Sequence, residues 1–164
     1  MKKLILAAAI AVFGLSNAQF KLGAHVGLPT GDAGDFFSFT LGVDAAYMWP
    51  VASEFNLGVA SGYSAWMGKT ITYPVIGSVK VDTVSMVPVA ASAEYKLTPE
   101  FSLGVDLGYG FLFGGGSSDG GFYYQPKAAY HFGASEVNLG YAGVSKNGST
   151  MSSVNLGYAY TFGK

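Results

Sequence analysis

The stretch EFSLGVDLGYGFLF, residues 100–113, places an apolar side chain at every second position. Such alternation is typical of a β-strand, whose successive side chains point to opposite faces. The other face is mostly glycine and serine and carries one charge, Asp106. Any fold for this chain must therefore accommodate strands with large apolar side chains on one face and small or polar side chains on the other. The apolar positions are Phe101, Leu103, Val105, Leu107, Tyr109, Phe111 and Phe113.

The same period of two recurs in eight segments. Each has about the 9 to 11 residues that a tilted strand needs to cross a bilayer. Tight turns alternate with longer polar or glycine-rich loops, which is typical of bacterial outer-membrane barrels. The sequence predicts an all-β domain over residues 19–164, an eight-stranded antiparallel up-and-down transmembrane β-barrel. The segments are residues 19–28, 36–49, 55–66, 83–97, 101–113, 121–132, 136–145 and 151–162.

Composition points to the same environment. Half of the residues are hydrophobic and only 12% are charged, whereas about a quarter of the residues in a soluble domain are charged. Beyond residue 18 no apolar run is long enough to span a membrane as a helix, so a closed barrel is the remaining way to satisfy the backbone in lipid. Residues 1–18 have the charged start, apolar run and small-residue cleavage site of a secretory signal peptide. We therefore expect export to the cell outer membrane, with both termini periplasmic because the strand number is even.

Several functional classes are disfavoured. The chain has no arginine, and residues 19–164 carry seven lysines against ten acids, a net charge of −3, which argues against a nucleic-acid partner. It has no cysteine and therefore no disulfide. Its two histidines, His25 and His131, lack a metal-binding spacing. We expect no cofactor, metal or catalytic residue. A lipid-modifying enzyme is the weakest alternative, because His25 and Asp44 would lie inside the barrel and away from the lipid-facing rim.

The charges indicate which face meets lipid. Every charged residue within the segments falls on the glycine-rich face, and a lysine on the lipid side near mid-bilayer would cost about 2–4 kcal/mol. Small residues also suit the narrow interior of an eight-stranded barrel. Aromatic residues at the strand ends, Phe37 and Phe39 among them, would form two interfacial girdles. The apolar face is therefore predicted to face lipid and the polar face the lumen.

Counting residues from the periplasmic edge predicts two layers of charge in the lumen. At mid-membrane, Asp106 would lie nearly opposite Lys127, and Asp44 near His25. Buried charges must be paired, because breaking a buried pair costs about 3–5 kcal/mol. We interpret the layer as a structural plug, with an ion path as the alternative. The layer nearer the periplasm would hold Lys21, Glu94, Lys96 and His131.

Two prolines interrupt the pattern. Pro88 and Pro126 lie inside predicted strands and cannot donate a ladder hydrogen bond. A bulge or a local break is expected at each. A bulge at Pro88 would move Glu94 and Lys96 by one position and so change their facing.

The longest loop, between the third and fourth segments, keeps a strand-like pattern. Residues 70–73 and 78–81 would pair across a turn at 74–77. This 70–81 hairpin would either offer an edge for strand addition by an extracellular protein or fold over the barrel mouth as a lid. The residues at its tip are Tyr73, Pro74, Val75, Ile76 and Gly77.

With eight strands, a signal peptide and aromatic girdles, the chain resembles the small eight-stranded outer-membrane β-barrel proteins of the outer-membrane protein A and X type, and proteins of the porin family with an outer membrane protein beta-barrel domain. Its C-terminal YAYTFGK keeps the alternating aromatics at Tyr158, Tyr160 and Phe162 but adds Gly163 and Lys164. The resemblance implies a monomer in outer-membrane lipid, inserted by the outer-membrane assembly machinery.

Two functions follow as expectations. The first is an integral outer-membrane barrel with a structural or surface-interaction role and a mostly plugged polar lumen. The alternative is a narrow porin-like channel for water, ions or small solutes.

Overall fold

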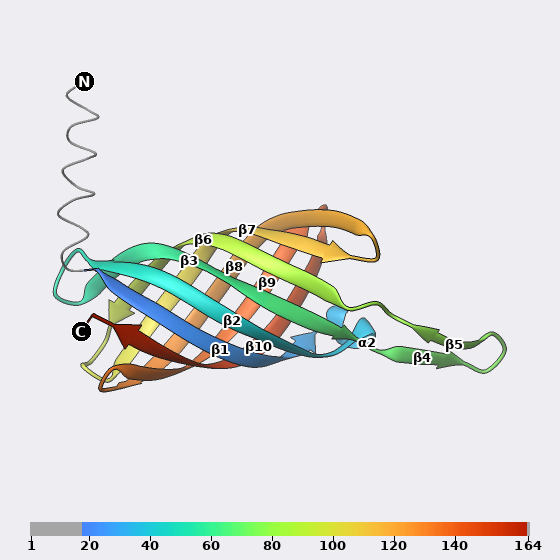
Figure 1. The fold of residues 1–164 in the computed structure, drawn as a ribbon, viewed down its shortest axis with the longest axis horizontal. Helices are drawn as coiled ribbons and strands as arrows, with labels where there is room; N and C mark the ends of the chain where they lie inside the picture. The colour runs from blue at the N-terminus through green and yellow to red at the C-terminus, as the bar shows by residue number, and fades with distance from the viewer. Residues whose placement is uncertain (1–17, 164) are drawn as a thin grey trace, which may run out of the picture.

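The computed structural model describes residues 18–163, and its strands close into a barrel in the order β1-β10-β9-β8-β7-β6-β3-β2 (Figure 1). This confirms the predicted eight-stranded antiparallel fold. Each barrel strand lies within a few residues of its predicted range. The elements are β1 (Gln19–Thr30), α2 (Ala33–Phe36), β2 (Phe37–Pro50), β3 (Phe55–Gly68), β4 (Thr70–Tyr73), β5 (Gly77–Lys80), β6 (Val84–Lys96), β7 (Phe101–Gly114), β8 (Ser117–Phe132), β9 (Ser135–Lys146) and β10 (Ser149–Phe162).

The first and last strands pair and close the barrel, with Phe20 opposite Phe162. They also place Gln19 and Phe162 at one end, which we call the terminal end; the β4–β5 hairpin extends from the other, the hairpin end (Figure 1). The signal peptide predicted for residues 1–18 lies outside the described residues, apart from Ala18. Among the described residues, no helix has the length and apolar character needed to cross a membrane.

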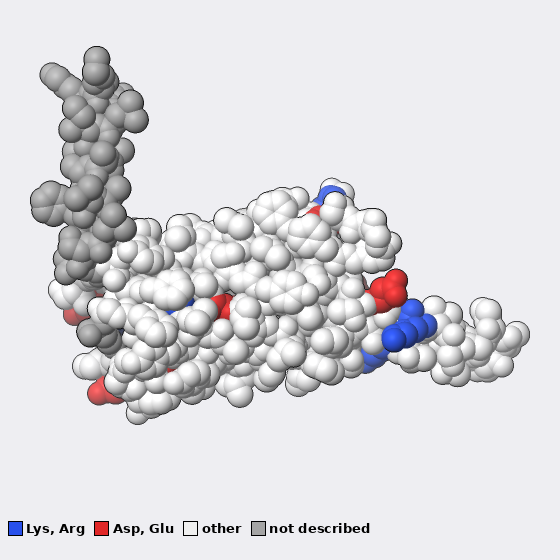
Figure 2. Space-filling model, in the orientation of Figure 1, with Lys and Arg blue, Asp and Glu red and all other residues white. Residues whose placement is uncertain are grey.

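Burial shows which face points outward. Leu103 and Leu107 are 51% and 46% exposed, whereas Asp106 between them is 3% exposed. In Figure 2 the barrel wall is almost entirely uncharged, and the charged atoms gather mainly near its two ends. The predicted facing of the apolar side chains is therefore confirmed.

Phe37 departs from the expected girdle. The β2–β3 pairing shifts register between Phe37 and Phe39, and such a bulge rotates the residues on one side of it to the opposite face. Phe39 points outward and is 46% exposed, whereas Phe37 is 8% exposed. Its ring meets Trp66 edge-on at 5.8 Å between centroids. The expectation that Phe37 belongs to the outer girdle was wrong, because strict alternation does not hold across a bulge.

The two prolines produce gaps in the ladders without bulges. The β3–β6 and β6–β7 pairings keep one register along β6, on both sides of Pro88. The β8–β9 pairing does the same around Pro126. At the first gap the Ser61 hydroxyl donates to the Pro88 carbonyl at 2.8 Å. The carbonyl oxygen thereby gains a hydrogen bond that lipid could not provide. Glu94 and Lys96 therefore still point inward. Of the two outcomes expected at the prolines, a bulge or a local break in pairing, the structure shows the break.

The hairpin half of the interior is mainly apolar, with a small group of buried polar side chains, Thr40, Ser153 and Asn155, hydrogen-bonded beside the apolar residues. Five large buried side chains, Phe37, Trp66, Met86, Tyr123 and Val144, pack with three alanines into what we call the apolar cluster. All five are less than 9% exposed. The expected polar lumen is therefore wrong for most of this half, because Trp66, Met86 and Val144 take inward positions and the bulge adds Phe37.

The predicted surface hairpin is present. β4 and β5 form their own two-stranded sheet, with Thr70 opposite Lys80 and Tyr73 opposite Gly77. It projects away from the barrel and does not cover the mouth as a lid would (Figure 1). The tip is strongly exposed, with Val75 at 94% and Ile76 at 80%.

Candidate functional site

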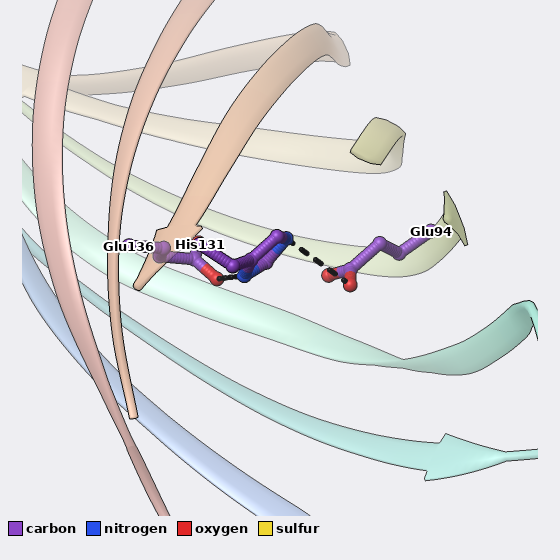
Figure 3. A group of neighbouring side chains, drawn as sticks. All are labelled: Glu94, His131 and Glu136. Carbon is purple, nitrogen blue, oxygen red and sulfur yellow. Dashed lines mark ion pairs between the residues drawn. The ribbon is translucent and has the colours of Figure 1, made fainter. Parts of the chain in front are cut away.

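The terminal half of the interior holds a charge cluster centred on Lys21 of β1. Its Nζ lies 2.5 Å from Glu94 Oε2 on β6 and 2.7 Å from Glu136 Oε2 on β9. His131 of β8 lies between the same carboxylates, with Nδ1 3.3 Å from Glu136 Oε2 and Nε2 3.8 Å from Glu94 Oε1 (Figure 3). We call these four residues the terminal cluster. It joins strands from opposite sides of the barrel, so it braces the cylinder across its diameter.

Neighbouring polar side chains complete the terminal cluster. The Ser102 hydroxyl lies 2.7 Å from His131 Nε2, and Asn56 Nδ2 donates to Glu94 Oε1 at 3.4 Å. Ser102 and Asn56 are themselves buried. Buried polar groups in such a network are stabilising only when each has partners.

The composition of this layer differs from the expected set at two positions. The structure brings Lys21, Glu94 and His131 together, but Lys96 forms no ion pair with any residue between 18 and 163. Glu136, which sequence reasoning missed, takes its place. The signal for Glu136 was its alternation with the outward Val137, which puts the carboxylate on the inner face.

Asp106 and Lys127 meet at mid-barrel, 2.7 Å apart between Oδ2 and Nζ. They are diagonal neighbours, because Asp106 pairs with Gln125 in the β7–β8 ladder and Lys127 pairs with Gly104. A side chain at Gly104 would approach Lys127 Cε to 3.1 Å, so glycine leaves the lysine room to lean toward its partner. The Ser92 hydroxyl donates to Asp106 Oδ1 at 2.5 Å. Both oxygens of this buried carboxylate therefore have partners.

His25 and Asp44 form the second mid-barrel pair, 2.6 Å apart between Nδ1 and Oδ2. The other ring nitrogen of His25, Nε2, lies 2.9 Å from the Ser64 hydroxyl. The imidazole packs over Gly42, where a Cβ would come within 2.5 Å of it. The ring is therefore held on three sides, with Asp44 as its only charged partner among the contacts in the described chain.

A cavity of about 60 Å³ lies between the two charge layers. Its lining includes Lys21, Asp44, Asp106 and Lys127, and of the apolar cluster it reaches only Tyr123. A water molecule needs about 10–15 Å³ by this measure, so the cavity has room for a few waters. The cavity therefore ends where the apolar cluster begins.

Part of the terminal cluster has the donor atoms of a metal site. Ligand atoms of Glu94, His131 and Glu136 lie within 4.8 Å of one another, and carboxylates with imidazole suit several divalent ions. However, Lys21 Nζ already contacts both carboxylates. A divalent ion there would have to displace the ammonium, because two cations at such short range repel each other strongly. We therefore interpret the cluster as an ion-pair network.

Comparison with known proteins adds the fold family. No protein-family model and no curated protein matches the sequence. Ail, the attachment invasion locus protein of Yersinia pestis, in complex with the heparin analogue sucrose octasulfate, has a TM-score of 0.57 at 14% identity, over 88% of this chain and 97% of that one. The N-terminal β-barrel domain of Pseudomonas aeruginosa OprF scores 0.54 at 12% identity, covering 90% and 98%. OprG from the same organism scores 0.52 at 9%, covering 90% and 96%.

At these identities the likeness is one of fold. The neighbours share with this chain a closed barrel of antiparallel strands, which agrees with the resemblance drawn from the sequence. This chain has the fold of the small eight-stranded outer-membrane β-barrels.

Proposed function

We propose that the protein is an integral outer-membrane β-barrel, exported by residues 1–18, whose interior is closed to solutes and whose role is structural or one of surface interaction. The outward apolar wall supports the membrane location, since such a surface is far larger than a soluble monomer exposes. The periplasmic side would be the terminal end, and the hairpin would project outside the cell. Two of the fold neighbours, Ail and OprG, are outer-membrane proteins and support the same location.

The observation that carries the closed interior is the apolar cluster. Trp66 is 1% exposed and Met86 3% exposed, and they lie in the path from the cavity to the hairpin end. The buried polar side chains beside this layer, such as Thr40 opposite Trp66 and Ser153 opposite Ala142, are uncharged. An ion would therefore have to cross without a charged partner and with little water, at a cost of several kcal/mol. The terminal cluster and the Asp106–Lys127 pair then act as structural braces.

Conductance in planar bilayers tests the closed interior. The purified protein is expected to give no stable openings under conditions in which a porin, added in parallel, conducts. Stable openings whose conductance changes in Asp106→Asn or Lys127→Gln would contradict the proposal and favour the narrow channel. Asp119→Asn is the matched control, because this carboxylate is exposed at the hairpin end.

The narrow channel is the second candidate, and the cavity lined by Asp44, Asp106 and Lys127 is the observation that favours it. In that case the apolar cluster would have to move aside. Met86→Ala, which thins the cluster, would then raise the conductance, whereas a permanently closed barrel stays silent in this variant.

The β4–β5 hairpin is the proposed interaction element. Both of its strands have an open edge, and an extended segment of an extracellular protein could add to either edge. Binding of intact cells to surfaces coated with a panel of extracellular proteins tests this. Ile76→Asp should reduce the binding, whereas Val51→Asp, at an exposed valine in a terminal-end turn, should not. Equal effects of the two would contradict a role for the hairpin.

A further inference from the structure

A second and larger cavity opens at the hairpin end of the barrel. Its volume is about 480 Å³, within the range of small-molecule sites. The floor is apolar and consists of Phe37, Leu112, Val144 and Met151, which come from four different strands. Phe37 and Val144 also belong to the apolar cluster. The cavity therefore ends on a closed floor and does not continue into the lumen.

The rim carries three charged residues, Asp32, Asp119 and Lys146. Lys146 and Asp119 form an ion pair, and the Gly120 N–H donates to the same carboxylate at 2.8 Å. The hydrogen bonds from Lys146 and Gly120 hold the pKa of Asp119 below its ordinary value, and Asp119 raises the pKa of Lys146. Both partners therefore stay charged at neutral pH, and together they are electrically neutral.

Asp32 is the charge that remains. It precedes α2, but its side chain does not cap the helix. It forms no ion pair with any residue of the described part of the chain. Next to an apolar floor, the rim thus presents one carboxylate without an ion-pair partner among the described residues; the nearby Lys69 ammonium donates to the Gly34 carbonyl.

We propose that this cavity is a binding site for a small primary amine with an apolar body. The body would cover Leu112, Val144 and Met151, and the ammonium group would pair with Asp32. Uncharged molecules of the same shape would lack this pairing, and carboxylates would be repelled by Asp32. The floor shares Phe37 and Val144 with the apolar cluster, but binding of an amine does not depend on whether the lumen conducts or the hairpin binds a partner, so the site goes beyond the proposed function.

Three probes of one shape test the site: 2-phenylethylamine, 2-phenylethanol and phenylacetate. Each is titrated into the full protein in lipid nanodiscs, and the methyl resonances of Leu112, Val144 and Met151 are followed by NMR. The amine is expected to shift them saturably, with an affinity at least tenfold above those of the other two. Equal shifts with all three probes, or shifts that never saturate, would show partition into the lipid only and would overturn the proposal.

Two variants locate the charge. Asp32→Asn is expected to weaken binding of the amine at least fivefold. Asp35→Asn removes another exposed carboxylate three residues further along, outside the cavity lining, and should leave the affinity unchanged. Equal losses in both would mean a general attraction to the surface and would contradict the site. Leu112→Trp should fill the cavity and abolish binding; if it fails to fold, Met151→Trp makes the same test from the other side of the floor.

Discussion

The two halves of the barrel interior are held together by different forces. In the terminal half, Lys21 joins two buried carboxylates and a cavity leaves room for water. In the hairpin half, mainly aromatic and aliphatic side chains fill the same cross-section, and no ion pair lies among these described residues. The outer wall is apolar along its whole length because lipid requires it. The contrast teaches that the interior of a small barrel obeys a weaker rule: it must be filled, and any charge in it must be paired.

The largest effect is expected from removing the centre of the charged half. Lys21→Met leaves Glu94 and Glu136 buried without their ammonium partner, which should lower the free energy of unfolding by about 3–5 kcal/mol. Urea unfolding in lipid vesicles, followed by tryptophan fluorescence, measures the loss. The loss should shrink as the pH falls, because protonated carboxyls carry no charge that needs a partner.

Two controls separate charge from shape in this experiment. Lys80→Met removes an exposed lysine from β5 and should leave the stability unchanged. Adding Glu94→Gln and Glu136→Gln to Lys21→Met should recover most of the loss, since no unpaired charge is then buried. A triple variant as unstable as Lys21→Met alone would show that the lysine stabilises by packing, and the contrast between the halves would fail.

The apolar half should respond to lost volume and be insensitive to pH. Met86→Ala opens a void in the apolar cluster and should cost about 2–5 kcal/mol. Met86→Leu keeps the volume and should cost less than about 1.5 kcal/mol. The same unfolding assay at two pH values measures both. A loss in Met86→Ala that changes with pH as the loss in Lys21→Met does would mean that the two halves are not distinct.

Between the two halves, the Asp106–Lys127 pair should show an intermediate effect. Its lysine side chain is 22% exposed toward the cavity, so water compensates part of any loss. Asp106→Ala should cost more than Asp106→Ala combined with Lys127→Met, with a coupling of about 1.5–3 kcal/mol. A double-mutant cycle in the same assay gives this value. Additive losses would contradict a direct interaction.

The fold could be predicted because the period of two is a property of every residue in a strand. Leu103 and Asp106 differ by an odd number of positions, and alternation alone puts them on opposite faces. The pairs at mid-barrel could be approached by counting depth along the strands. Their diagonal register could not, because it depends on where the turn of the hairpin closes, near Gly115.

The sequence did not predict the features that lie where the alternation of apolar and polar residues is interrupted or has just started. Phe37 turned inward because of a bulge that no residue type announces. Glu136 lies just after a tight turn, where the inner face of the new strand has only begun. Pro88 was expected to allow a bulge, but the strand accepts the proline and Ser61 compensates for it. The apolar cluster, in turn, arises from side chains contributed by several different strands, so no single segment reveals it.

The smallest effect is expected outside both halves, at the exposed Asp119–Lys146 pair. An exposed pair contributes little to stability, so Lys146→Ala should leave the unfolding free energy unchanged within error. The lowered pKa of Asp119 means a contribution that is present at neutral pH and lost as the pH falls through that pKa, so any small effect of Lys146→Ala belongs to neutral pH and disappears in acid. The Gly120 amide reports this titration directly, since its N–H donates to Asp119. Its NMR midpoint should move up in Lys146→Ala and stay in place in Lys80→Ala; an unmoved midpoint in Lys146→Ala would show that the lysine does not hold the carboxylate.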